Sequence, residues 1–190
     1  ISEAVEKSGA DFGVIFDTDC DRAACVDKNA QDINRNKLVA LASYIALKDN
    51  KGGIIVTDSV TSDGLAKFIE KDLGGVHHRF KRGYKNVIDE AIRLENEENK
   101  NAPLAIETSG HAAFKENYYL DDGAYLITKI IIELAKLNKE GKSIESLIEN
   151  LETPVEEKEV RFTIKLDDFR DYGLSVIEDF KKLCENTDGV

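Results

Sequence analysis

Short apolar runs alternate with longer amphipathic segments along most of this chain. The runs at residues 12–16, 23–26, 54–56, 77–80 and 104–106 have the length and composition of strands. In the longer segments between them, apolar residues recur at the three- and four-residue spacing of a helix face. Strands that alternate with helices in this way predict an α/β fold, with mixed, mostly parallel sheets flanked by helices.

Four helices are expected between these strands. Asn36 is expected to cap the first helix, and Ser62 or Asp63 to cap the second. The third is expected over residues 85–97. The fourth is expected to begin near Asp122, because a carboxylate suits the N-terminal end of a helix dipole.

Two polar segments indicate boundaries in this arrangement. Residues 27–35 are rich in turn-forming residues, and residues 151–159 contain a proline and a run of charges. Beyond the second segment, apolar residues alternate at 160, 162 and 164 as in a half-exposed strand, and residues 169–184 have a helical pattern. This last part is too short to be a stable domain alone, so we expect it to be the opening of one.

Composition excludes some classes of binding partner and indicates the cellular compartment. The formal net charge of −11 argues against nucleic acids and anionic membranes. No apolar stretch approaches the length of a membrane span. The three cysteines form no Cys-x-x-Cys pair, which favours a reduced, cytoplasmic protein. The chain contains no methionine, even at position 1, so we expect it to be part of a longer protein or to have lost its start.

The richest chemistry lies directly after the first strand. Asp17, Asp19 and Asp21 are spaced two residues apart, and Arg22 follows them. Three carboxylates this close repel one another unless a cation neutralises them, and carboxylate oxygens suit Mg²⁺ or Ca²⁺ better than a soft metal. The guanidinium of Arg22 can bind a phosphate or carboxylate beside that metal. This segment therefore predicts a divalent-metal site.

Other polar residues also follow predicted strands. Asp58 follows the strand at 54–56, Lys81 follows 77–80, and Glu107 follows 104–106. The carboxyl ends of parallel strands meet at one edge of a sheet, where ligands of open α/β sheets bind. We therefore expect these residues to line one cleft.

Two of these positions open loops with recognisable chemistry. The loop at 107–111 reads Glu-Thr-Ser-Gly-His, and its carboxylate, hydroxyls and imidazole suit the vicinal hydroxyls of a sugar. Gly110 makes this loop tight. The loop at 81–85 places three cations around a glycine in an otherwise acidic protein, which favours an anion such as phosphate.

Together these motifs resemble those of the α-D-phosphohexomutases, the phosphoglucomutase and phosphomannomutase superfamily. Residues 17–22, Asp-Thr-Asp-Cys-Asp-Arg, are similar to the family's Asp-x-Asp-x-Asp-Arg metal loop. Residues 107–111 are similar to its Glu-x-Ser-Gly-His sugar-recognition loop, and the basic glycine loop lies between them as in the family. The resemblance extends over most of the chain.

This resemblance implies a Mg²⁺-dependent isomerase. Asp17, Asp19 and Asp21 are the implied Mg²⁺ ligands, together with an oxygen of a catalytic phosphoserine. The phosphoryl group passes between that serine and a hexose phosphate substrate, through a hexose 1,6-bisphosphate. Arg22 is implied to contact the phosphoserine or the transferring group.

The remaining roles implied by the resemblance concern the substrate. Glu107 and Ser109 would bind sugar hydroxyls, and Lys81 and Lys85 would bind the substrate. His111 and Lys81 would lie near the reacting phosphate and hydroxyl, as candidates for proton transfer or charge stabilisation.

The resemblance also implies how the chain is divided. Residues 1–33 would be the end of the second family domain, 34–152 the third, and 153–190 the start of the fourth. No serine-histidine phosphorylation loop is present. The expected partners are thus the missing domains of the same polypeptide, without which the fragment should be inactive. Thr18, Cys20 and Ile106 also stand where the family usually has glycine.

Three alternatives remain at this point. In a haloacid-dehalogenase-type phosphatase, Asp17 would be the nucleophile and the pair Asp121-Asp122 would bind metal, but we assign that pair to helix capping. The second alternative is a calcium module of the EF-hand type. An EF-hand loop requires glycine at its sixth position, where this chain has Arg22. A module that only binds metal and sugar phosphate is the third.

Overall fold

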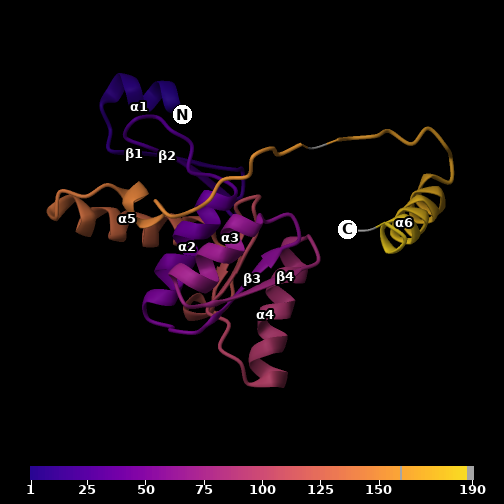
Figure 1. Cartoon of the computed structure of the whole chain (residues 1–190). Coiled ribbons are helices and arrows are strands. Elements are labelled where there is room, and N and C mark those ends of the chain that lie inside the picture. Colours follow the sequence, from indigo (N-terminus) through magenta and orange to yellow (C-terminus); the bar gives the residue numbers. More distant parts are fainter. Residues whose placement is uncertain (159, 188–190) are drawn as a thin grey trace. The chain divides into compact units, whose positions relative to one another are not determined.

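A four-stranded sheet forms the centre of the part from Ile1 to Pro154 (Figure 1). The computed structural model describes residues 1–158 and 160–187. The strand order is β4 (Val76–Phe80), β3 (Ile54–Asp58), β5 (Leu104–Ile106) and β6 (Ala112–Phe114). β3 is parallel to both β4 and β5, whereas β5 and β6 are antiparallel. The predicted α/β class, with a mixed and mostly parallel sheet, is confirmed.

Helices cover both faces of this sheet. α2 (Asn36–Lys48) and α5 (Gly123–Lys139) pack on one face, and α4 (Tyr84–Glu98) packs on the other. Because successive strand residues point to opposite faces, Ile55 joins the first core and Val56 the second. Shorter helical elements also lie in this part: α3 (Asp63–Lys67), the π-helix η1 (Phe68–Asp72) and the 3₁₀ turns η2 (Lys115–Asn117) and η3 (Ile144–Leu147).

A two-stranded antiparallel ribbon precedes this α/β/α arrangement. It consists of β1 (Phe12–Phe16) and β2 (Ala23–Asp27), and follows the short helix α1 (Ser2–Ser8). Phe16 pairs with Ala23, so the acidic segment 17–22 forms the loop at the end of the ribbon. An isolated antiparallel bridge between Arg22 and His111 joins this loop to the one after β5.

The start of α2 differs from the prediction. Arg35, not Asn36, occupies the N-cap position. The side chain of Asn36 instead accepts a hydrogen bond from the backbone N–H of Ser62 at 3.0 Å. The predicted caps Ser62 and Asp122 are confirmed, because their side chains accept from the backbone N–H groups of Leu65 and Tyr125.

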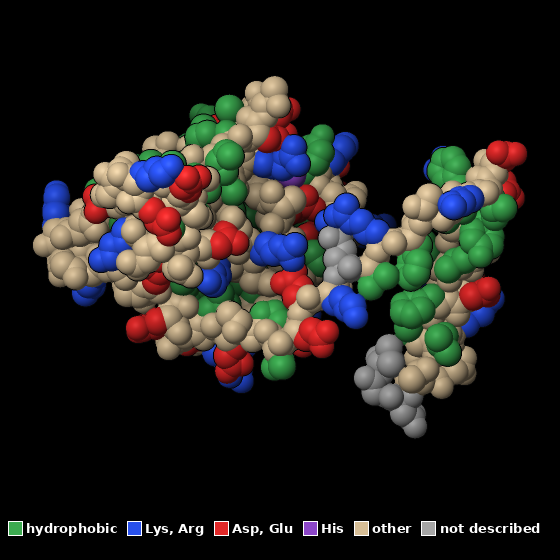
Figure 2. Space-filling view, turned by 90° about the horizontal axis from the view of Figure 1, so that it is seen from above, with side chains coloured by type: hydrophobic (Ala, Val, Ile, Leu, Met, Phe, Trp, Pro, Cys, Tyr) green, Lys and Arg blue, Asp and Glu red, His purple; other side chains and the backbone are tan. Residues whose placement is uncertain are grey.

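The second unit, from residue 155 onward, contains helix α6 (Phe169–Glu185). The strand predicted around residues 160–164 is wrong: this segment is neither helix nor strand, and no described strand pairs with it. Residues 159 and 188–190 of the predicted last domain lie outside the described residues. Hydrophobic side chains are exposed along α6 (Figure 2). Among the described residues, no helix has the length and apolar character needed to cross a membrane.

Candidate active site

The three loop aspartates lie together at the end of the β1–β2 ribbon. One carboxylate oxygen each from Asp17, Asp19 and Asp21 lies within 4.8 Å of the others. Asp19 is exposed, and the other two are half-buried. The predicted metal-ligand residues are thus brought together by a short loop whose ends are fixed by paired strands.

Arg22 holds one of these carboxylates. Its Nε and Nη2 donate to Asp17 Oδ2 at 2.7 and 2.6 Å, and its backbone N–H donates to Oδ1 at 3.2 Å. Loss of hydration opposes the ionisation of Asp17, but the hydrogen bonds and charge of Arg22 outweigh it and lower the pKa of the carboxyl. Asp17 is therefore held as a carboxylate.

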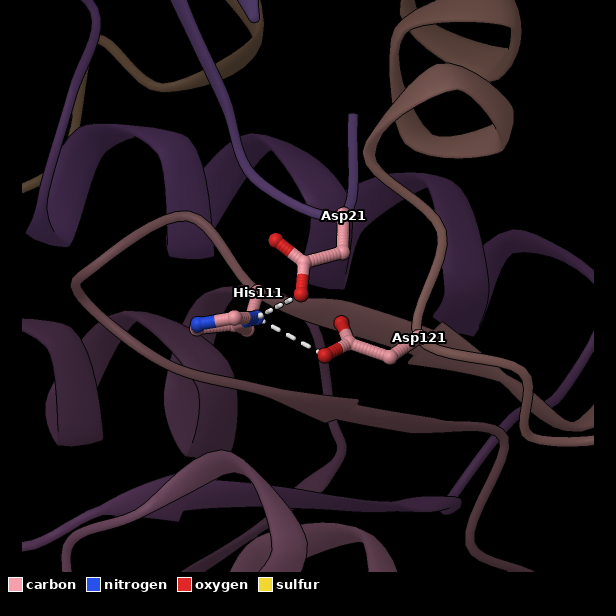
Figure 3. A group of neighbouring side chains, drawn as sticks. All are labelled: Asp21, His111 and Asp121. Carbon is pink, nitrogen blue, oxygen red and sulfur yellow. Dashed lines mark hydrogen bonds and ion pairs between the residues drawn. The ribbon is translucent and has the colours of Figure 1, made fainter. Parts of the chain in front are cut away.

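His111 lies between two other carboxylates (Figure 3). Its Nδ1 is 2.7 Å from Asp121 Oδ2 and 3.7 Å from Asp21 Oδ2. The second ring nitrogen points away from both. Oδ1 of Asp21 and Oδ1 of Asp121 are buried without a hydrogen-bond partner. Burial raises the pKa of Asp121, although the nearby imidazole partly offsets this.

The loop after β5 is fixed from within the protein. Glu107 is 5% exposed; its Oε1 accepts from the backbone N–H of Gly83 at 2.6 Å, and its Oε2 accepts from Ser109 Oγ at 3.1 Å. Thr108 Oγ1 donates to Asp58 Oδ2 at 2.9 Å. Burial raises the pKa of Asp58. Glu107 and Ser109 are thus brought next to each other, as expected.

The basic loop lies beside this recognition loop, but the contacts of its two lysines are with other residues. Lys85 pairs with Asp89 one turn along α4, at 2.6 Å. Lys81 is exposed and lies 5.9 Å over the ring of Phe80. The contact between the loops is made by Gly83 and by Tyr84, whose ring stacks on that of His111.

Two residues of this site were missed by sequence reasoning. Asp121 was assigned to helix capping with Asp122, and this is wrong for Asp121, which contacts His111. The isolated bridge between Ala113 and Asp121 brings it there, and no sequence spacing predicts that contact. Tyr84 belonged to the basic loop but had been given no role.

Comparison with known proteins identifies the family. The family model for phosphoglucomutase/phosphomannomutase, alpha/beta/alpha domain III, matches residues 34–155. The chain belongs to this family. The resemblance to α-D-phosphohexomutases is therefore confirmed, and the match favours this family over the haloacid-dehalogenase alternative.

Relatives and solved structures agree. The phosphoglucomutase/phosphomannomutase of Thermococcus kodakarensis is 36% identical over 149 residues, which are 78% of this chain and 30% of that protein. The phosphomannomutase/phosphoglucomutase of Pseudomonas syringae is 30% identical over 179 residues, which are 94% of this chain and 36% of that protein. A phosphoglucomutase/phosphomannomutase family structure from Burkholderia thailandensis matches with a TM-score of 0.69 and 28% identity, covering 82% of this chain and 32% of its own. The chain spans about a third of the length of these relatives.

Proposed function

We propose that this chain supplies the metal-binding and sugar-recognition parts of a Mg²⁺-dependent phosphohexomutase. The enzyme would move a phosphoryl group between the 1 and 6 positions of a hexose phosphate, through a hexose 1,6-bisphosphate and a phosphoserine on another segment of the polypeptide. One observation carries the proposal. The Arg22–His111 bridge joins the loop of three aspartates directly to the recognition loop, which supports a single site for both the metal and the sugar.

The acidic loop fits Mg²⁺. Its three carboxylates offer only hard oxygen donors, and Asp21 Oδ1 is buried without a hydrogen bond, with the guanidinium of Arg22 3.7 Å away. An oxygen left in this way is costly unless it gains a partner, so a cation ligated by Asp17, Asp19 and Asp21 would relieve it. When bound, Mg²⁺ would neutralise charge on the phosphoryl oxygens.

The other residues would bind and orient the substrate. Glu107 would accept hydrogen bonds from sugar hydroxyls and Ser109 would exchange one with them. Arg22, Lys81 and Lys85 would provide positive charge for phosphate oxygens. This requires Arg22 to share or release Asp17, and Lys85 to leave Asp89.

His111 is the proposed proton-transfer group. We assign the proton of the 2.7 Å contact with Asp121 to Nδ1, so that Asp121 accepts it and the other ring nitrogen can exchange a proton with a hydroxyl. Lys81 would stabilise charge nearby.

We also propose that residues 1–33, 34–152 and 153–190 belong to three successive domains, and that the protein is cytoplasmic, as its three free cysteines favour.

Calorimetry on the 190-residue chain tests the metal assignment. Titration with Mg²⁺ should give a binding isotherm that Asp19→Asn weakens at least tenfold, because a ligand is lost. Asp11→Asn is the matched control: it removes the same charge from an exposed position outside the loop and should leave the affinity unchanged. Equal isotherms for the two variants would contradict the assignment.

A second titration tests the substrate class. Glucose 1,6-bisphosphate added with saturating Mg²⁺ should bind, and Glu107→Gln should weaken this binding while leaving Mg²⁺ affinity intact. Turnover is then measured in an enzyme of the relatives' full length that carries this chain. Binding without turnover there would favour the binding-only alternative.

A further inference from the structure

Tyr84 occupies a position that the core does not explain. It lies within the basic loop and is the first residue of α4. Its side chain is 48% exposed, so it contributes little to the buried interior. One face of its ring nevertheless lies on the imidazole of His111, with ring centroids 4.7 Å apart and planes inclined by 22°. This is the geometry of a stacked aromatic pair.

The stack adds a constraint on the ring plane of His111. The hydrogen bond from Nδ1 to Asp121 fixes one atom of the ring, but the imidazole can still tilt about that contact. A flat ring against its face opposes this tilt. The stack also covers the imidazole. The side chain of His111 is only 13% exposed, whereas Tyr84 is 48% exposed.

The backbone fixes Tyr84 in register with the recognition loop. Gly83, the residue before it, donates its N–H to Glu107 Oε1 at 2.6 Å. The loop that carries Tyr84 is therefore tied to the loop that carries His111 at two points, a hydrogen bond and a stack. Displacement of Glu107 would move both.

We propose that Tyr84 is a positioning residue that fixes the ring plane of the His111 imidazole, while the contact with Asp121 fixes Nδ1, so that the second ring nitrogen is directed away from the carboxylates. This proposal rests on the proposed function only where the second ring nitrogen is used for proton transfer. The contact between Tyr84 and His111 does not depend on that function.

NMR of the imidazole protons tests the positioning role without substrate. The chain has three histidines, so His77 and His78 serve as internal references for folding. The proton on Nδ1 of His111 should give a slowly exchanging signal, because Asp121 accepts it and Tyr84 shields it. Tyr84→Ala should abolish this signal, and Tyr84→Phe, which keeps the flat ring, should preserve it.

Tyr172→Ala is the matched control, since Tyr172 is also 48% exposed and lies in α6. It should leave all three histidines unchanged. Persistence of the Nδ1 proton in Tyr84→Ala would overturn the proposal. If that variant also disturbs His77 and His78, Tyr84→Leu replaces it: this keeps bulk but removes the flat face, and the same loss or persistence decides.

Kinetics separate this proposal from the proposed function. In an enzyme of the relatives' full length, Tyr84→Ala should lower kcat at least tenfold with little change in KM, and Tyr84→Phe should restore it. A chain that binds neither Mg²⁺ nor the bisphosphate would refute the proposed function, while the NMR result would still decide the role of Tyr84. An unchanged kcat together with a lost Nδ1 signal in Tyr84→Ala would refute proton transfer by His111, whereas an unchanged kcat with a retained signal would refute the positioning role of Tyr84.

Discussion

Gly110→Ala tests the contact on which the site depends most directly. Gly110 has a φ of +101°, and a Cβ built on it would lie 2.5 Å from the backbone oxygen of Ala23. Ala23 opens β2, and its N–H donates to the carbonyl of Gly110 at 3.4 Å. The absence of a side chain is therefore what allows the recognition loop to lie against the ribbon that carries the acidic loop.

Two costs add up in this variant. A residue with a side chain in a sparsely populated backbone region costs about 1–3 kcal/mol. Overpacking against a neighbour costs about 1–3 kcal/mol more, and here the neighbour is backbone that cannot rotate away. We therefore expect Gly110→Ala to lower the free energy of unfolding by roughly 2–6 kcal/mol.

Gly52→Ala is the control for the backbone cost alone. Gly52 has a φ of +73°, and a Cβ there would meet nothing within 4 Å. This variant should lose only about 1–2 kcal/mol. Urea unfolding followed by tyrosine fluorescence measures both, because the chain has six tyrosines and no tryptophan.

The test compares the loss of unfolding free energy in Gly110→Ala with that in Gly52→Ala. If Gly110→Ala loses no more stability than Gly52→Ala, the close approach of Gly110 to Ala23 is not a constraint on the fold. If the loss is larger but the slope of the unfolding transition also changes, the comparison is made with thermal unfolding, since the urea extrapolation then no longer measures the same reaction.

Four further variants test the packing and the charges. Leu126→Ala in α5 removes a fully buried side chain and should cost about 2–5 kcal/mol, whereas Ile131→Ala on the same helix, where the side chain is 47% exposed, should change urea stability by less than about 0.5 kcal/mol. Asp122→Ala removes the N-cap of α5 and should lower stability by about 0.5–2 kcal/mol, measured by thermal unfolding. Burial lowers the pKa of His77 from its ordinary 6.5 to about 4, so the unfolded chain takes up the proton first and stability should fall as the pH drops through this window. His77→Gln should flatten that fall, and an unchanged urea midpoint profile in the variant would contradict it.

Most elements were predictable because their apolar residues follow one clear period. β3 and β5 are runs of buried residues, and the first turns of α3 and α5 carry capping side chains. β6 was not predicted, because three residues, Ala-Ala-Phe, give no pattern that distinguishes a strand from a loop. The segment around residue 160 has the alternation of a strand but no described partner, and a strand without a hydrogen-bonded neighbour does not form.

The site was predictable where residues follow strands and not where loops meet. The register of the parallel strands pairs Thr57 with both Arg79 and Ile106. The residues that follow must therefore share one edge of the sheet. The contacts of His111 with Asp121 and with Tyr84 depend on how separate loops fold back, and residue spacing carries no signal for either.

The carboxylates at this edge of the sheet differ in how many hydrogen bonds they already accept from the protein. Both oxygens of Asp58 are engaged by Thr108, and Arg22 engages both oxygens of Asp17. Glu107 has one hydrogen bond on each oxygen, and since a carboxylate offers about four acceptor sites, the sugar binding proposed for it does not require release of the basic loop. Asp21 keeps one buried oxygen without a hydrogen bond, 3.7 Å from Arg22 Nε, while its other oxygen lies near His111. Structural anchoring and ligand capacity are thus combined in the same residues, so a substitution such as Glu107→Gln must be assessed by stability and by binding together.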